Sequence, residues 1–285
     1  MHSTGGSGTG DDDAAGPGTG GSARQEGQGP GRRSVLRGVA VAAVAGALGT
    51  GGGALTARAL GDRRSPTYRV SPRPETRTTA CAARVVWRTG CAEPYVALTF
   101  DDGPDPRWTP LVLDLLARYD AHATFFQHGS AALEHPEVAR AVAAAGHEIG
   151  SHGWDHTDLT RFEPAECLDL LARTHDTLVE TTGAVPRWLR PPYGRLDAPV
   201  LYAAAELGYD VALWSHHLPT DGAEATVDRD LATASPGMVI LCHDGRGTPA
   251  PSLYVAVERL VRTLTERGMR LVTMSEIDDA APAHG

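Results

Sequence analysis

The sequence from Glu93 onward predicts an α/β fold, a barrel of parallel strands surrounded by helices. Short apolar runs alternate there with longer amphipathic stretches, which is the pattern of repeated strand and helix units. The runs expected to be strands are Tyr95 to Phe100, Ala123 to Phe126, Glu148 to Ser151, Trp188 to Arg190, Val211 to Trp214, Met238 to Cys242 and Leu271 to Thr273. The stretches expected to be helices are Thr109 to Arg118, Pro136 to Ala145, Pro164 to Thr181, Ala198 to Leu207 and Leu253 to Arg267.

Polar residues follow the carboxyl ends of these runs, and this is the second observation behind the fold class. They include Asp101, His152, Arg190 and His243. In a closed barrel all carboxyl ends converge on one mouth, so residues distant in the sequence can meet around one substrate. A doubly wound open sheet is the alternative, and it would bring ligands only to a reversal of strand order.

Composition limits the size of the domain and the kind of partner. The chain has 285 residues, 41% of them hydrophobic, which is enough for one substantial core. We place the catalytic domain at residues 93–277, between a linker at 60–92 and a tail at 278–285. The 26 basic residues, all Arg, face 35 acidic ones, for a formal net charge of −9. An acidic chain does not concentrate phosphate backbones, so we expect no nucleic-acid partner, whereas a neutral polysaccharide is compatible.

The first part of the chain predicts export. Residues 1–31 are mostly Gly, Ser, Asp and Thr and predict a disordered extension. Residues 32–59 resemble a twin-arginine signal peptide, with paired arginines before an apolar run and a cleavage position after Ala59. The run from Val39 to Leu48 is well short of the roughly 20 residues that span a bilayer, so we expect no stable membrane insertion, with an uncleaved anchor as the alternative. The protein is therefore expected to be secreted or associated with the cell envelope.

Four cysteines in an exported protein allow three pairings. Cys81 and Cys91 flank a short segment that can fold back as a hairpin, and oxidation is expected outside the cytoplasm. A disulfide is therefore predicted between them. Cys167 and Cys242 fall in a predicted helix and a predicted strand, where small buried thiols are common, and they are expected to be free.

Asp101 and Asp102 end the first long strand, just before Gly103 and Pro104. Side chains alternate along a strand, so these two carboxylates are expected to point apart, one toward a metal ion and the other toward a water molecule. For this motif taken alone, a turn with helix-capping aspartates is an equal alternative.

His152 and His156 are four residues apart, which places both imidazoles on one face if the segment forms a helical turn. A histidine pair at this spacing is often incidental. With a carboxylate from another strand end, however, it forms a set of two imidazoles and one carboxylate with open positions. Such a set is typical of a catalytic metal site, and imidazole ligands suit zinc.

Two further motifs follow later strands. Arg190 precedes Pro191 and Pro192, which stiffen a loop that can aim backbone amides. His243 ends the sixth predicted strand. Each motif is weak evidence alone, because a turn with an exposed Arg and an isolated His are both common.

The motifs TFDDGP, HGWDH, RPPYG and LCH occur in this order at successive strand ends. In order and spacing the chain resembles the polysaccharide deacetylase family, also called carbohydrate esterase family four or the NodB-type domain, over residues 93–277. The resemblance implies a distorted (β/α)7 barrel, which agrees with the seven expected strands. It also implies metal-dependent removal of N-acetyl groups from a polysaccharide such as peptidoglycan or a chitin-like polymer.

The resemblance also implies a role for each motif residue. Asp101 would be the catalytic base and His243 the acid that protonates the departing amine. The ligands of a divalent ion, zinc with cobalt as the alternative, would be Asp102, His152 and His156. Arg190 would hold Asp101 ionised, and the backbone amide of Tyr193 would stabilise the oxyanion. The residues expected to contact the substrate are Pro192, Tyr193, Trp214 and Leu241.

Two segments depart from the family pattern. Gly153 stands where the family usually has Ser or Thr, which removes a supporting hydrogen bond. His217 replaces an Asp, and Thr220 and Asp221 stand where the family has an Asp-Trp pair, at positions that tune the acid and wall the acetyl pocket. A one-residue shift of the loop would let Asp221 substitute.

Two other functions stay open. The same site serves O-acetyl esters in relatives that act on xylan, and ester cleavage demands less of the acid. A catalytically silent carbohydrate-binding protein is the second alternative, and the intact Asp101, His243 and metal ligands argue against it. The sequence makes no prediction of oligomeric state.

Overall fold

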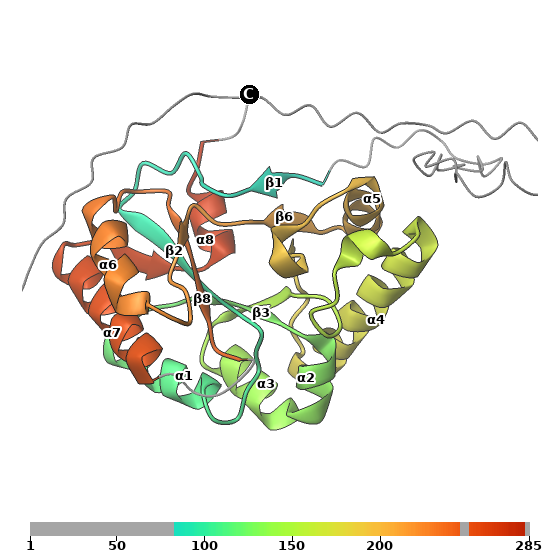
Figure 1. The fold of residues 1–285 in the computed structure, drawn as a ribbon, viewed down its shortest axis with the longest axis horizontal. Coiled ribbons are helices and arrows are strands. Elements are labelled where there is room, and N and C mark those ends of the chain that lie inside the picture. The colour runs from blue at the N-terminus through green and yellow to red at the C-terminus, as the bar shows by residue number, and fades with distance from the viewer. Residues whose placement is uncertain (1–82, 246–250, 283–285) are drawn as a thin grey trace, which may run out of the picture. The chain divides into compact units, whose positions relative to one another are not determined.

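The computed structural model of the protein describes residues 83–245 and 251–282. The strands in this part of the chain form one sheet, and every ladder between them is parallel (Figure 1). The strands are β1 (Val85–Val86), β2 (Tyr95–Asp101), β3 (Thr124–Gln127), β4 (Glu148–Ser151), β5 (Trp188–Leu189), β6 (Asp210–Ala212), β7 (His216–His217), β8 (Val239–His243) and β9 (Arg270–Val272). Their order is β1-β6-β5-β4-β3-β2-β8-β7, and β9 pairs with the amino-terminal half of β2.

The predicted fold class is confirmed. All seven expected strands are present, each within two residues of its predicted bounds. From β2 to β6 each strand lies beside the preceding one, and β7 and β8 then follow in order on the other side of β2. This circular order is that of a curled, barrel-like sheet. The two-residue strands β1 and β7 were not expected, because two residues are too few for a periodic signal. In particular, His216 and His217 follow the expected strand Val211 to Trp214 and pair with β8.

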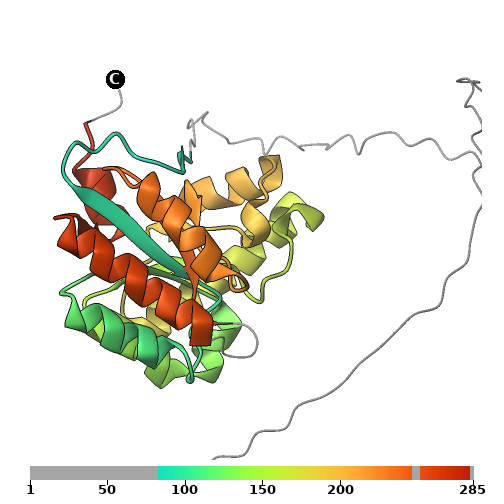
Figure 2. The same cartoon turned by 60° about the vertical axis from the view of Figure 1, so that its left-hand side comes forward.

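The helices alternate with the strands and pack against the sheet (Figures 1 and 2). They are α1 (Thr109–Arg118), α2 (Gly129–Glu134), α3 (Pro136–Ala144), α4 (Pro164–Thr182), α5 (Ala198–Glu206), α6 (Ala223–Ala232), α7 (Pro251–Glu266) and α8 (Met274–Asp279), with 3-10 turns η1 (Leu159–Arg161) and η2 (Pro192–Gly194). The five expected helices are confirmed within two residues of their predicted bounds. Helices α2, α6 and α8 were not predicted.

Alternation along β2 decides which side chains enter the core and which face the site. Leu98 and Phe100 are fully buried against the helices on one face, in a cluster that includes residues of α1, α3, α6 and α7. Burying a large apolar side chain contributes about 1.5–3 kcal/mol, so this face holds the helices in place. Ala97 belongs to a separate cluster on the opposite face. Because side chains alternate, Thr99 and Asp101 share that inner face.

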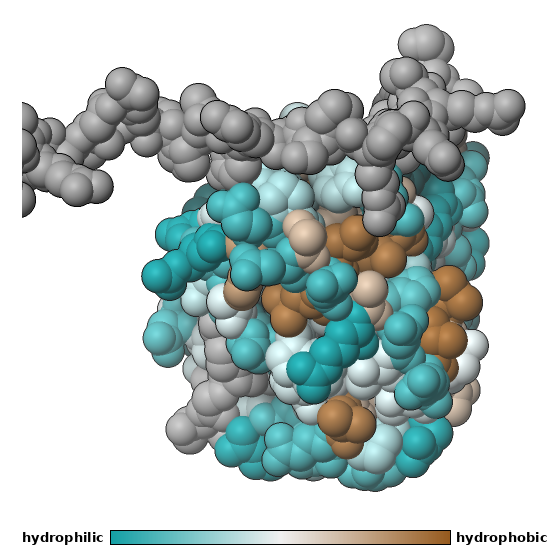
Figure 3. Space-filling view, turned by 90° about the vertical axis from the view of Figure 1, so that its right-hand side faces the viewer, coloured by the Kyte–Doolittle hydropathy of each residue, from teal (hydrophilic) through white to brown (hydrophobic). Residues whose placement is uncertain are grey.

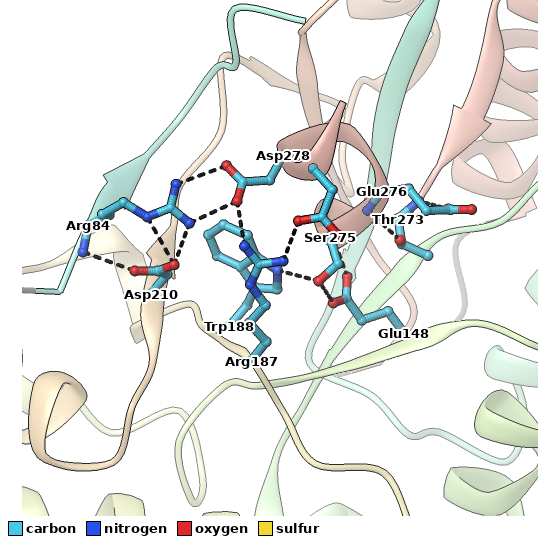
Figure 4. A network of polar contacts seen from close by, with 10 residues as sticks. Arg84, Glu148, Arg187, Trp188, Asp210, Thr273, Ser275, Glu276 and Asp278 are labelled. Atoms are coloured by element: carbon cyan, nitrogen blue, oxygen red, sulfur yellow. Dashed lines mark hydrogen bonds and ion pairs between the residues drawn. The ribbon is translucent and has the colours of Figure 1, made fainter. Parts of the chain in front are cut away.

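The amino-terminal edge of the sheet is closed by a polar network (Figure 4). Asp278 of α8 accepts hydrogen bonds from Arg84 at 2.8 Å and from Arg187 at 2.6 Å. Ser275 accepts a bond from Trp188 Nε1 at 3.0 Å and donates one to Glu148. These contacts join α8 to the segments that lead into β1, β4 and β5.

Several sequence-based predictions lie outside the described residues. The disordered extension, the twin-arginine signal and Cys81 fall there, so export and the Cys81–Cys91 pairing stay predictions. Cys167 and Cys242 are buried free thiols, as expected. In the described ranges we find no helix with the length and apolar character needed to span a bilayer.

The face beside α4 and α5 is mostly hydrophilic, with separate hydrophobic patches (Figure 3).

Candidate active site

Asp101 is the last residue of β2 and is 3% exposed. The fully buried Arg190, just after β5, donates through Nη1 to Asp101 Oδ1 at 2.8 Å and to Thr99 Oγ1 at 2.7 Å. Its Nε and Nη2 donate to the carbonyls of Ala212 and Leu213, both at 3.0 Å. The guanidinium is therefore held on three sides, and one carboxylate oxygen of Asp101 is fixed by it.

The two carboxylates of the first motif do not point apart. Asp102 Oδ1 lies 3.4 Å and Asp101 Oδ2 lies 3.7 Å from the same atom, Nε2 of His152. The expectation of divergence is wrong because it assumed a continuous strand. Asp102 adopts the left-handed conformation, with φ of 75°, and this turn brings its side chain back toward that of Asp101.

Three imidazoles surround the carboxylate of Asp102. The distance from its Oδ1 to Nε2 is 3.4 Å for His152, 3.4 Å for His156 and 3.3 Å for His128. Burial disfavours charge on Asp102, but the contacts with His128 and His152 hold the pKa of this carboxyl well below its usual range. An ionised carboxylate oxygen among ring nitrogens is a donor set that fits a divalent cation.

The tautomer of His152 also fits a metal ligand. Its Nδ1 lies 2.7 Å from the backbone carbonyl of Arg190, which can only accept a hydrogen bond. The Nδ1 atom therefore carries the proton, and in the neutral imidazole Nε2 presents its lone pair toward Asp102. A backbone carbonyl that orients a ligating imidazole in this way is a recurrent support of metal sites.

The HGWDH segment forms a tight turn and not the regular helical turn assumed from its spacing. Gly153 has φ of 75° and His156 has φ of 63°. The positive φ at the second position suits Gly, the residue that departs from the family pattern. The ring of Tyr193 meets that of His156 edge to face, with centroids 4.4 Å apart, so η2 is brought beside the imidazole cluster.

The η2 loop has little freedom. Tyr193 is itself left-handed, with φ of 62°, and its side chain is exposed. At Gly194 a side chain would lie 2.9 Å from Trp214, so only Gly fits. Pro192 is buried beside Gly153. The loop thus packs between the HGWDH turn and Trp214, both expected to belong to the site.

His243 ends β8 directly opposite Asp101 in the parallel ladder. The pKa of His243 is lowered from its ordinary value, because burial outweighs the opposing effect of the Asp101 and Asp102 carboxylates, and His217 lowers it further. The rings of His217 and His243 are 5.6 Å apart between centroids. Asp221 is exposed and is not among the groups that shift the pKa of His243, so the suggested substitution through a loop shift is not seen.

Two residues of this edge were not singled out from the sequence. His128 directly follows β3. Like the other polar residues that follow strand ends, it could have been identified from its place in the sequence. Asp244 is buried next to His243, and its Oδ2 accepts a hydrogen bond from Thr109 at 2.6 Å. Burial and the neighbouring carboxylates of Asp102 and Asp101 raise the pKa of Asp244 to about 7.

Comparison with known proteins agrees with this geometry. A family model described as polysaccharide deacetylase matches residues 90–212. A peptidoglycan N-acetylglucosamine deacetylase of Bacillus cereus is 36% identical over 198 residues, which cover 68% of this chain and 92% of that protein. The chain belongs to the polysaccharide deacetylase family.

Members of the polysaccharide deacetylase family differ in how much of their length this chain matches. The peptidoglycan N-acetylmuramic acid deacetylase PdaC of Bacillus subtilis is 37% identical over 188 residues, covering 65% of this chain but only 38% of PdaC. Among solved structures, the Bc1960 peptidoglycan N-acetylglucosamine deacetylase in complex with a naphthalenyl hydroxamate has a TM-score of 0.65 and 30% identity, covering 68% of this chain and 92% of that one.

Proposed function

We propose that this protein is a metal-dependent hydrolase that removes N-acetyl groups from an amino-sugar polysaccharide. The observation that carries the proposal is the meeting, at one edge of the sheet, of Asp101, the Asp102 carboxylate with its imidazoles, and His243. An acetamide is a poor electrophile and an amine is a poor leaving group. A cation and a base together would promote attack of water on the acetamide, and an acid would protonate the leaving nitrogen.

Asp102, His152 and His156 would hold the ion. The ligand atoms would be Oδ1 of Asp102 and the Nε2 atoms of the two histidines, each of which lies 3.4 Å from that oxygen. This set leaves coordination positions for substrate and water, as in catalytic zinc sites, and cobalt is the alternative. When bound, the ion polarises the acetyl carbonyl and makes water more acidic.

The remaining residues would divide the proton transfers. Asp101, fixed by Arg190, would accept a proton from the attacking water through Oδ2. His243, on the neighbouring strand, would deliver a proton to the departing nitrogen. The backbone N–H of Tyr193 would stabilise the oxyanion. The residues that would line the acetyl pocket are Pro192, Tyr193, Trp214 and Leu241.

The charge environment of His243 would differ from that of typical relatives. His217 lies where most members have an Asp, so its ring provides no negative charge to favour the imidazolium. The carboxylates of Asp101 and Asp102 would supply negative charge in its place, but burial outweighs them, so the pKa of His243 stays below its ordinary value.

The substrate would be a polymer of N-acetylated amino sugars in the cell envelope. Two of the relatives carry names of peptidoglycan deacetylases, one for N-acetylglucosamine and one for N-acetylmuramic acid residues. The export signal predicted at residues 32–59 would take the protein to such a polymer.

The test is acetate release. The full chain, stripped of metal and reloaded with zinc or cobalt, is incubated with N-acetylglucosamine oligomers and with acetylated xylan, with Asp101→Asn as the control. We expect metal-dependent acetate from the amino-sugar oligomers that is lost in the variant. Acetate from xylan alone would replace the proposal with an O-acetyl esterase, and bound metal without release from either would favour a binding protein.

A further inference from the structure

His128 lies inside the imidazole cluster although it belongs to none of the sequence motifs. It follows β3 directly, and its backbone N–H donates to the carbonyl of Gly103 at 2.9 Å, which ties it to the turn that carries Asp102. The side chain is 8% exposed. It is therefore a buried imidazole placed by a neighbouring strand and not a flexible surface histidine.

Its Nε2 lies at nearly the same distance from Asp102 as the Nε2 atoms of the two motif histidines. Asp102 Oδ1 lies 3.3 Å from Nε2 of His128, against 3.4 Å for both His152 and His156. Ligand atoms roughly 2.1 Å from a zinc ion are roughly 3.0–3.6 Å apart at the angles of four- and five-coordinate sites. Asp102, His128 and His152 each offer a ligand atom, and these three atoms lie within 4.8 Å of one another.

Both ring nitrogens of His128 are buried. In the described residues Nδ1 has no hydrogen-bond partner, whereas Nε2 has the 3.3 Å contact with Asp102 Oδ1. A buried polar atom without a partner costs free energy, and such atoms are uncommon unless a ligand or ion completes them. His152, by contrast, uses Nδ1 to bond a carbonyl and has only Nε2 left for a ligand.

We propose that His128 is a fourth protein ligand of the divalent ion, which would make the site one of three imidazoles and one carboxylate. The inference rests on the proposed function for the presence of a metal. It changes the coordination: four protein ligands and a water molecule require an ion that accepts at least five ligands. It also raises affinity, because each added nitrogen donor strengthens binding of late first-row divalent metals.

The experiment counts imidazoles and measures affinity. X-ray absorption spectra of the zinc-loaded full chain are expected to fit three imidazole ligands, and those of His128→Asn two. The zinc dissociation constant, measured by competition with a chromophoric chelator, is expected to rise at least tenfold in His128→Asn. The visible spectrum of the cobalt form should also change, since it depends on the number of ligands.

The matched control is His147→Asn. His147 is 8% exposed, like His128 a buried histidine with an unpartnered nitrogen, but it lies at the other edge of the sheet. This variant is expected to keep three imidazoles and the wild-type affinity. Two imidazoles in the wild type would overturn the inference even if His128→Asn did not fold. In that case acetate release would still support the proposed function, whereas a wild type that binds no zinc and releases no acetate would overturn both.

Discussion

The two edges of the sheet hold similar residues and make different sites. At the amino-terminal edge, His147 and His122 pack with ring centroids 5.9 Å apart, beside a cavity of about 310 Å³ that Glu148 also lines. Glu148 accepts hydrogen bonds there from the hydroxyls of Thr124 and Ser275. At the carboxyl-terminal edge, three imidazole nitrogens converge on one oxygen of Asp102.

Histidine and carboxylate content alone therefore does not make a metal site. Hydroxyl donors satisfy the carboxylate at the amino-terminal edge, and the histidines beside it contribute burial. At the other edge, imidazole nitrogens take the place of hydroxyl donors, and a bound cation would satisfy the nitrogens and the carboxylate together. The difference is one of geometry, and it originates in the left-handed turn at Asp102.

The largest expected effect separates the two buried carboxylates. Asp101→Asn removes the proposed base, so acetate release is expected to fall by about 10²–10⁴-fold while zinc content is unchanged. Glu148→Gln, the matched change at the amino-terminal edge, is expected to keep wild-type turnover. Both variants are assayed for acetate and for metal content. Equal losses of turnover would mean that the edges do not differ in function.

Arg190→Leu is expected to cost stability as well as turnover. It leaves Asp101 buried without its cation, and breaking one side of a buried pair lowers the free energy of unfolding by about 3–5 kcal/mol. Urea unfolding of the metal-free variant measures this loss. A change below about 1 kcal/mol would show that the pair does not hold the carboxylate in place.

The pH dependence of the unfolding free energy should reveal the titration of His147 at the amino-terminal edge. Burial and His122 lower the pKa of His147 to about 4, against an ordinary value of 6.5. The neutral ring is thus favoured by folding, so its contribution is complete above pH 6.5 and is lost as pH falls toward 4. The shift corresponds to about 3 kcal/mol. Unfolding of the metal-free protein between pH 7 and 4 measures it.

His147→Asn provides the comparison for that titration. Its stability is expected to decline less between pH 7 and 4 than that of the wild type. Parallel curves for the two proteins would assign the acid sensitivity to other groups.

The smallest effect is expected at an exposed pair. The Arg84 side chain is 40% exposed and contacts Asp210 and Asp278. Solvent screens such pairs, so Arg84→Ala should lower the unfolding free energy by no more than about 1 kcal/mol in thermal or urea unfolding. A loss as large as that of Arg190→Leu would contradict the contrast between buried and exposed arginines.

The long strands and helices and most of the site residues could be predicted from the sequence. The local turns that position the site residues could not. Apolar runs identified the long strands because buried parallel strands are continuously hydrophobic. Helix α2, six residues long, has too few turns for a periodic signal. Left-handed residues such as Asp102 and His156 cannot be inferred from strand or helix periodicity.

The site residues that the motifs did not include were missed for a related reason. His128 has no second histidine at ligand spacing, and its importance comes from the register of β3 against β2 and β4. Arg190 could be assigned to Asp101 only through the family resemblance, because its bonds to Thr99 and to two carbonyls depend on the curvature of the sheet.

The most direct test of a metal centre at the carboxyl-terminal edge is anomalous X-ray diffraction from crystals of the zinc-loaded full chain, recorded above and below the zinc absorption edge. The account predicts one strong anomalous peak among Asp102, His152 and His156, within bonding distance of all three. A peak in the cavity beside His122 and His147, or no peak in protein that releases acetate, would contradict it.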